Sequence, residues 1–140
     1  MSQGRLNVHE LKGRVGPGCL EKVDLLLQEV WATSADVSGT DRTMFETAVI
    51  EIAGNIVQHG SSEASINCTL TIEVYPDRLD AHFRDDGVAA PVNIDTASMP
   101  DPLAESGRGL AMAKAALDAL VYERHDNNNF WTLSRLLTAS

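Results

Sequence analysis

The strongest constraint on the fold is a change of hydrophobic period near residue 60 of the 140-residue chain. Before it, apolar residues recur at helical spacing in two segments, from residue 17 to about 35 and from about 40 to about 59. After it, residues 65–75 alternate apolar and polar side chains with the period of two that is typical of a half-buried strand. The sequence therefore predicts two helices followed by a sheet.

Turn-forming residues divide the rest of the chain into shorter elements. Pro17 is expected to open the first helix, and Thr40 or Asp41 to cap the second. The remaining expected elements are strands at 6–11 and 79–83, a long loop at 85–107, an Ala-rich helix at 110–120, and a closing hairpin of 121–125 and 130–137 around Asp126-Asn127-Asn128-Asn129. This order predicts one α+β domain over residues 1–140, a two-layer sandwich of helices on a mixed, mostly antiparallel sheet.

Charge and composition exclude several classes of protein. A net charge of −9, with no run of Lys or Arg, disfavours direct binding to nucleic acid or to an anionic membrane. The two cysteines, Cys19 and Cys68, form no CxxC pair, which suits buried thiols in a reducing compartment. A disulfide between them remains an alternative at this point. The N-terminus lacks the apolar core of a signal peptide, so we expect a soluble, cytoplasmic protein.

A row of polar residues follows one side of the second expected helix. Glu51, Asn55 and His59 stand four residues apart, and the row drifts into the apolar arc of the helix. Polar groups beside a core cost free energy unless something satisfies them. The row is either a structural stripe of hydrogen bonds between successive turns or the floor of a polar site. In such a site, Asn55 offers a neutral oxygen to a hard cation and Glu51 serves as a base.

Two further segments combine charge with glycine. Asp85-Asp86-Gly87 directly follows a strand, which indicates either a plain turn or a carboxylate that accepts a hydrogen bond from a ligand amine. Ser106-Gly107-Arg108-Gly109-Leu110 leads into a helix, either as an ordinary loop end or as main-chain N–H groups that approach an anion.

Three competing site types find no support in the sequence. The glycines at 107 and 109 lack the third glycine of a dinucleotide fingerprint, and no GK[ST] motif is present. The histidines have no metal-ligand spacing with either cysteine. Structural roles are expected for Cys19, Cys68, His9, His82 and His125.

Taken in order, the motifs resemble a known set. Glu51-x-x-x-Asn55 on a helix, Asp85-x-Gly87 after a strand, a long loop and Gly107-x-Gly109 at a helix start resemble the N, G1 and G2 boxes of the ATPase superfamily of gyrase, heat-shock chaperones, histidine kinases and mismatch-repair proteins. Within it, the small size and the run Asn55-Ile56-Val57-Gln58-His59-Gly60 look most like the anti-sigma-factor serine/threonine kinases.

The resemblance implies ATP and Mg²⁺ as cofactors and a role for each motif residue. Asn55 would ligate Mg²⁺, and Glu51 would position or deprotonate the attacking hydroxyl. Asp85 would accept from the adenine amino group, and Gly87 would permit close approach. The main-chain N–H groups of Gly107, Arg108, Gly109 and Leu110 would hold phosphate oxygens, His59 would lie near the phosphates, and residues 88–106 would form a lid over the nucleotide.

The same resemblance implies partners. The protein would phosphorylate a Ser or Thr of an anti-sigma-factor antagonist and bind a sigma factor; whether it forms a homodimer stays open. Two positions depart from the family's pattern: Ala89 stands where a second glycine is usual, and Glu105 where some kinases carry arginine. Because phosphoryl transfer relies on cations, Glu105 favours an alternative, a nucleotide-dependent partner-binding switch without efficient kinase activity. A structural domain without nucleotide is a third, weaker possibility.

Overall fold

The computed structural model describes residues 4–60, 66–90 and 105–138, without the side chains of 59–60 and 105–108. The elements are β1 (Asn7–Arg14), α1 (Cys19–Thr33), α2 (Gly39–Gly60), β2 (Asn67–Val74), β3 (Arg78–Asp85), α3 (Glu105–Ala116), β4 (Ala119–His125) and β5 (Asn128–Leu136). Their order is the one that the sequence predicts. No helix in these ranges is both long and apolar enough to cross a membrane.

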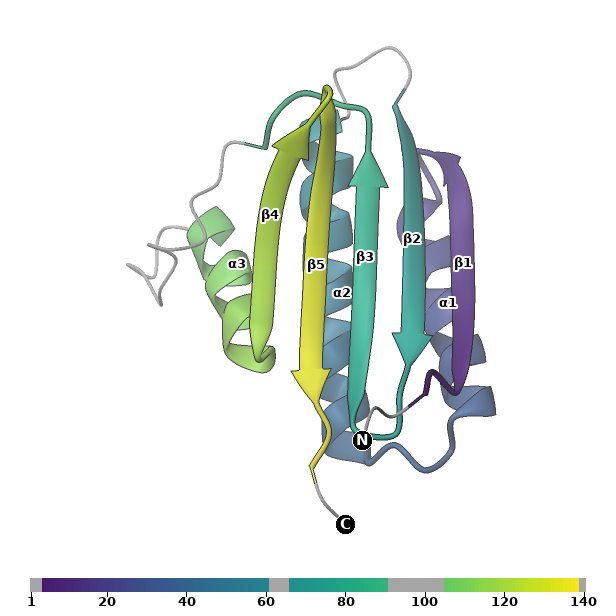
Figure 1. Cartoon of the computed structure of the whole chain (residues 1–140). Helices are drawn as coiled ribbons and strands as arrows, with labels where there is room; N and C mark the ends of the chain where they lie inside the picture. The colour runs from purple at the N-terminus through teal and green to yellow at the C-terminus, as the bar shows by residue number, and fades with distance from the viewer. Residues whose placement is uncertain (1–3, 61–65, 91–104, 139–140) are drawn as a thin grey trace.

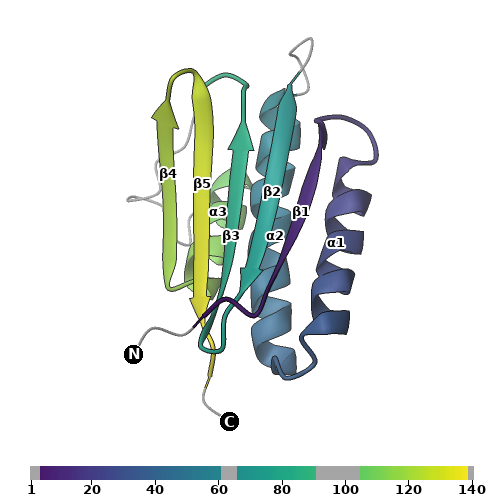
Figure 2. The same cartoon turned by 45° about the vertical axis from the view of Figure 1, so that its right-hand side comes forward.

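The five described strands form one sheet in the order β1-β2-β3-β5-β4. All neighbouring strands are antiparallel, so the expected mixed sheet is wrong in that detail. The helices lie together on one face of the sheet, with α2 behind its centre, α1 beside β1 and α3 near β4 (Figures 1 and 2). The predicted α+β two-layer sandwich is confirmed.

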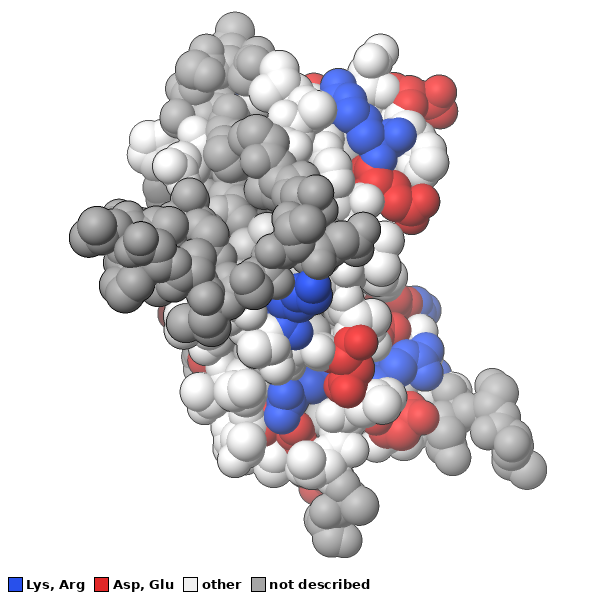
Figure 3. Space-filling view, turned by 90° about the vertical axis from the view of Figure 1, so that its left-hand side faces the viewer, with Lys and Arg blue, Asp and Glu red and all other residues white. Residues whose placement is uncertain are grey.

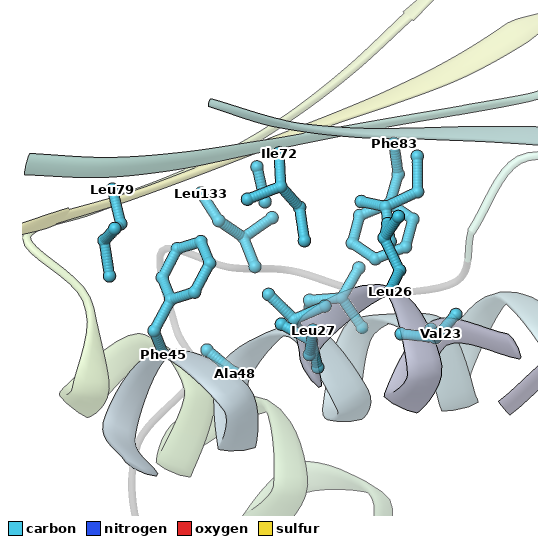
Figure 4. Close-up of a cluster of buried hydrophobic side chains, with 14 of the residues drawn as sticks. Val23, Leu26, Leu27, Phe45, Ala48, Ile72, Leu79, Phe83 and Leu133 are labelled. Carbon is cyan, nitrogen blue, oxygen red and sulfur yellow. The ribbon is translucent and has the colours of Figure 1, made fainter. Parts of the chain in front are cut away.

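The core lies between α2 and the inner face of the sheet. Phe45, Ala48 and Ile52 of α2 are fully buried, as the helical period predicts. They face apolar side chains that alternate along the strands, among them Ile72, Leu79, Phe83 and Leu133 (Figure 4). Burying such side chains contributes about 1.5–3 kcal/mol each, so this layer positions α2 firmly against the strands.

The helix starts differ from those expected. Cys19 begins α1, after Gly18 with φ +84°, and not Pro17. Ser38 caps α2: its Oγ accepts the Asp41 main-chain N–H at 3.1 Å and donates to the Asp41 carboxylate at 2.9 Å. The predicted cap at Thr40 or Asp41 is therefore wrong, because the hydroxyl of Ser38 caps the helix and Asp41 lies in its first turn.

The third helix is also displaced from its expected range. It begins at Glu105 and ends at Ala116, whereas the sequence pattern predicted residues 110–120. Glycine disfavours a helix interior by about 1 kcal/mol, so Gly107 and Gly109 suggested a loop. Packing of α3 against α2 overrides that preference. The two glycines therefore lie inside the first turns of α3, and not in front of it.

The closing hairpin turns more tightly than expected. His125 pairs with Asn128, so the connection is only Asp126-Asn127, with φ of 51° and 65°. Two successive positive φ angles are typical of a type I′ turn, which Asp and Asn tolerate. Asn128 and Asn129 therefore belong to β5, and Asn129 lies buried on the helix-covered face.

Figure 3 shows the side of the molecule that carries β4 and α3. Where the described residues are visible on this face, Lys and Arg are interspersed with Asp and Glu and do not gather into one patch.

Candidate functional site

A small cavity lies where β3 ends, between the sheet and α2. It is lined by Asn55, Ile56, Ile66, Asp85, Gly87, Val88, Ala90, Asn129 and Trp131. Three of the residues singled out in the sequence, Asn55, Asp85 and Gly87, thus share one cavity although they come from two separate segments. Asn55 and Asp85 are both buried, at 8% and 5% exposure.

Asp85 is held at the end of β3 by two donors. Its Oδ1 accepts the main-chain N–H of Gly87 at 3.0 Å and the Asn129 amide at 2.9 Å. A Cβ on residue 87 would lie 3.0 Å from Ile66 Cδ1 and 3.1 Å from Asp85 Oδ1. Glycine at 87 therefore allows the chain to turn back tightly onto the carboxylate.

Three residues of the β4–β5 hairpin complete the site, and the sequence analysis missed them. Asn129 Nδ2 donates to the Val88 carbonyl at 2.7 Å as well as to Asp85. Its Oδ1 accepts from the Tyr122 hydroxyl and from Arg124 Nη1. The signal in the sequence was the pair Asp126-Asn127, because a two-residue turn there gives the register that points Asn129 inward.

The cavity is small. Its volume of about 20 Å³ holds about one water molecule, far less than a purine ring. Ile56 and Trp131 belong to the core, whereas Val88 is 52% exposed and Ala90 is partly exposed. Val88 and Ala90 thus form the more exposed part of the cavity lining.

The carboxylate of Glu51 lies against α3, one helical turn before Asn55. A Cβ added to Gly109 would come within 2.1 Å of Glu51 Oε2, so glycine at 109 leaves the space that this carboxylate occupies. Leu110 is buried in the core, and as the sixth residue of α3 it lies beyond the first four main-chain N–H groups, which are those that a helix leaves free for a ligand. The Glu51 carboxylate thus lies beside the first turns of α3, one helical turn from the cavity residue Asn55.

Some predicted site features lie outside the described parts of the chain. They are the side chains of His59, Glu105 and Arg108, and most of the expected lid, at residues 91–104. The main chain places 107–110 in α3, which packs against α2.

A different group of metal-ligating side chains lies on the outer face of the sheet. Ligand atoms of Glu73, Asp80 and His82 come within 4.8 Å of one another. Arg5 pairs with Glu73 at 2.7 Å and Arg78 with Asp80 at 3.1 Å, so both carboxylates are already neutralised. Burial raises the pKa of Glu73, but the hydrogen bond from Arg5 and the nearby His82 outweigh it and hold the pKa below its ordinary value. This cluster is therefore a surface network in which two arginines balance the charge of the two carboxylates.

The two cysteines line a second cavity, of about 30 Å³, between β1, α1 and α2. Both are free thiols. Burial, with Asp85 nearby, raises the pKa of Cys68 to about 12, so this side chain stays a neutral thiol. That agrees with the structural role expected for it.

Comparison with known proteins shows the fold and the family of the chain. The fold is similar to a solved structure, the RsbU and RsbW domains of Rv1364c from Mycobacterium tuberculosis, with a TM-score of 0.67 at 19% identity. The match covers 96% of this chain and 34% of that one, so the chain spans about a third of that protein. No curated protein matches the sequence. Residues 17–135 match the sequence family of the histidine kinase-like ATPase domain, and the chain belongs to that family.

Proposed function

We propose that the protein binds ATP with Mg²⁺ and transfers the γ-phosphoryl group to a serine or threonine of a partner protein. The observation that carries the proposal is the convergence of Asn55, Asp85 and Gly87 on one cavity, with Glu51 one turn away against α3. Family membership supports ATP as the nucleotide. Kinase activity on a serine or threonine is a narrower claim than membership of this family, and it belongs to the proposal.

The cavity residues are proposed to bind different parts of the nucleotide. Asp85 accepts a hydrogen bond from the adenine amino group, and Gly87 keeps the wall thin enough for that approach. Asn55 offers a neutral amide oxygen, a ligand type that suits Mg²⁺. His59 and the main-chain N–H groups of Gly107 and Arg108, in the first turn of α3, are assigned to the phosphate side, where a helix start favours negative charge.

Glu51 is assigned as the general base. In phosphoryl transfer the protein mainly positions the nucleophile and stabilises charge. The Glu51 carboxylate would accept the proton of the incoming hydroxyl as that oxygen bonds to the γ-phosphorus and the bond from phosphorus to the β–γ bridging oxygen breaks, so that ADP leaves. Mg²⁺ held by Asn55 would supply positive charge against the phosphates. The place of Glu51 beside Gly109, one helical turn from Asn55, supports this role.

The proposed partners are an anti-sigma-factor antagonist, as the phosphorylated protein, and a sigma factor. Their support is the resemblance of the motifs to the anti-sigma-factor kinases, together with a fold shared with a structure that contains an RsbW domain. A homodimer is compatible with this proposal and is not required by it.

A second function is favoured by Glu105. This acid stands where some related kinases carry arginine, and a cation there would neutralise charge that develops during transfer. The alternative is a switch that binds a partner according to its nucleotide and transfers phosphate poorly.

Two substitutions separate these functions and give our first prediction. Glu51→Gln keeps the volume of the side chain, so Mg-ATP affinity changes little, while single-turnover transfer falls by roughly 10²–10⁴-fold because the base is lost. Asn55→Ala weakens Mg-dependent ATP binding itself. The matched control is Glu29→Gln, the same chemical change on an exposed turn of α1, which leaves both measurements unchanged.

The measurements are calorimetric titration with Mg-ATP and transfer of radioactive phosphate to a serine-bearing antagonist. Wild-type transfer rates in Glu51→Gln would show that Glu51 is not the base. A wild type that binds ATP and phosphorylates no antagonist would favour the binding switch. If both Glu51→Gln and Asn55→Ala only lower thermal stability, the polar row is structural.

A further inference from the structure

A hydrogen-bond network joins the β4–β5 hairpin to the carboxylate that lines the cavity. Asn129, 2% exposed, is its centre. The amide nitrogen donates to Asp85 and to the Val88 carbonyl, and the amide oxygen accepts from Arg124 at 2.9 Å and from Tyr122. Because Arg124 can only donate and a carbonyl can only accept, the amide has a single orientation that satisfies its neighbours.

Side chains of the hairpin also form hydrogen bonds with the main chain that follows Asp85. Arg124 Nη1 donates to the Gly87 carbonyl at 2.9 Å, and the Ala90 N–H donates to the Tyr122 hydroxyl at 2.9 Å. Tyr122 is itself fixed by its ring, which packs on Trp131 with centroids 4.7 Å apart. Asn129 is therefore held rigidly by two neighbours on β4.

The consequence for Asp85 is that one carboxylate oxygen is committed. The bonds from Asn129 and from the Gly87 N–H both end on Oδ1. Rotation of the carboxylate about its Cβ–Cγ bond would break both of them. A ligand in the cavity is then recognised through Oδ2 alone.

One-oxygen recognition distinguishes the two purines. The edge of adenine offers one amino group, which a single carboxylate oxygen accepts. Guanine presents its ring N–H and its 2-amino group side by side, a pair that a carboxylate binds with both oxygens, and its carbonyl oxygen repels a carboxylate placed opposite it. A fixed Asp85 therefore suits adenine, whereas a carboxylate free to rotate would also accept guanine.

We propose that Asn129, held by Tyr122 and Arg124, is a specificity-determining positioning residue that selects adenine by restricting Asp85 to one oxygen. Asn129 acts through Asp85, and it lies outside the three motifs that mark the ATPase family. The inference rests on the proposed function, because it concerns the nucleotide that the same cavity binds.

The test is the ratio of ATP to GTP affinity in Asn129→Ala, measured by calorimetry with Mg²⁺. Removing the amide lets water take its place and leaves the Gly87 N–H as the remaining described donor that holds the Asp85 carboxylate against rotation. We expect the ratio to fall about 10-fold or more, the scale of a hydrogen bond to a charged group, with GTP binding gained. Asn128→Ala is the matched control, since its amide donates only to the turn carbonyl of Asp126 among the described residues, and it leaves the ratio unchanged.

The ratio separates positioning from general damage. Looser packing of the more exposed lining residues Val88 and Ala90, or a less stable fold, changes the affinity for both nucleotides alike. If Asn129→Ala does not unfold cooperatively as the wild type does, Tyr122→Phe is the second variant, because it removes one donor to Asn129 and keeps the ring on Trp131. Its ratio is expected to fall about 3-fold.

Each outcome decides the inference. A folded Asn129→Ala or Tyr122→Phe with the wild-type ratio overturns it and leaves ATP binding standing. A wild type that binds ATP and GTP equally overturns it as well, because no selection exists to explain. A wild type that binds neither nucleotide overturns the proposed function, and this inference with it.

Discussion

Each end of the sheet buries one aspartate, and the two carboxylates are held in different ways. Asp41, at the start of α2, is 1% exposed and is bonded on both oxygens, to Arg135 and Thr138 and to Ser38 of its own cap. Asp85, at the end of β3, lies beside a cavity, and its bonds to Asn129 and Gly87 fall on one oxygen. The two sites lie at opposite ends of the molecule (Figure 1).

The contrast separates a structural carboxylate from a recognition carboxylate. Arg135 Nε lies 2.9 Å from Asp41 Oδ1, and the same guanidinium donates to the Ala116 carbonyl at 2.7 Å, so this ion pair ties α2, α3 and β5 together. Asp85 is oriented by a neutral amide, and the cation Arg124 contacts that amide. A carboxylate without a directly paired cation keeps more of its capacity to accept from a ligand.

The largest expected effect comes from removing the structural carboxylate, Asp41. Asp41→Asn leaves the Arg135 guanidinium without its counter-charge in a mostly buried place, and we expect the free energy of unfolding to fall by about 3 kcal/mol. Urea unfolding measures this loss. ATP affinity at a temperature where the variant is folded should equal that of the wild type. Lost ATP binding in the folded variant would contradict the division between the two ends.

The next effect concerns the recognition side. Asp85→Asn keeps an oxygen for Gly87 and Asn129 but places a donor where the adenine amino group needs an acceptor. We expect ATP affinity to fall by about 1–3 kcal/mol, with a smaller loss of stability than in Asp41→Asn. Calorimetry and urea unfolding on the two variants give the comparison directly. The assignment fails if Asp85→Asn binds ATP as tightly as the wild type.

The smallest effect is a pH dependence that belongs to Asp41. Burial raises the pKa of this carboxyl, but hydrogen bonds from Thr138, Ser38 and Arg135 outweigh it and hold the pKa below its ordinary 3.8. Its stabilising contribution is therefore present above about pH 3.8 and is lost as the pH falls through the folded-state pKa, by at most about 1.4 kcal/mol per pH unit.

The check on this dependence is the difference in unfolding free energy between wild type and Asp41→Asn. That difference should shrink as the pH is lowered below about 3.8. Comparing variants also removes the contributions of Glu73 and Asp86, whose pKa values are lowered as well. A difference that stays constant with pH would mean that Asp41 does not titrate as proposed.

Local patterns in the sequence predicted the elements and part of the site. The helical period identified the buried face of α2, and alternation identified β2, because side-chain direction follows backbone period regardless of what packs on it. The spacing of Asp85 and Gly87 predicted a tight turn that the structure contains. Helix ends were less accurate. The Ser38 cap is a local contact with Asp41 that the sequence analysis missed, whereas the glycines of α3 lie in a helix that packs against α2.

The sequence by itself determined the order of elements, the helix-covered face of the sheet and the residues of the family's motifs, because these depend on neighbours within a few residues. Only the tertiary structure decided that Asn129, Arg124 and Tyr122 support Asp85, or that Glu51 lies against Gly109. The contacts of Asn129 depend on strand register, because a hairpin turn one residue longer would point Asn129 to the opposite face, whereas the contact of Glu51 with Gly109 depends on the packing of α3 on α2. Asn129 and Asp85 are 44 residues apart, and only the pairing of β3 with β5 brings them together.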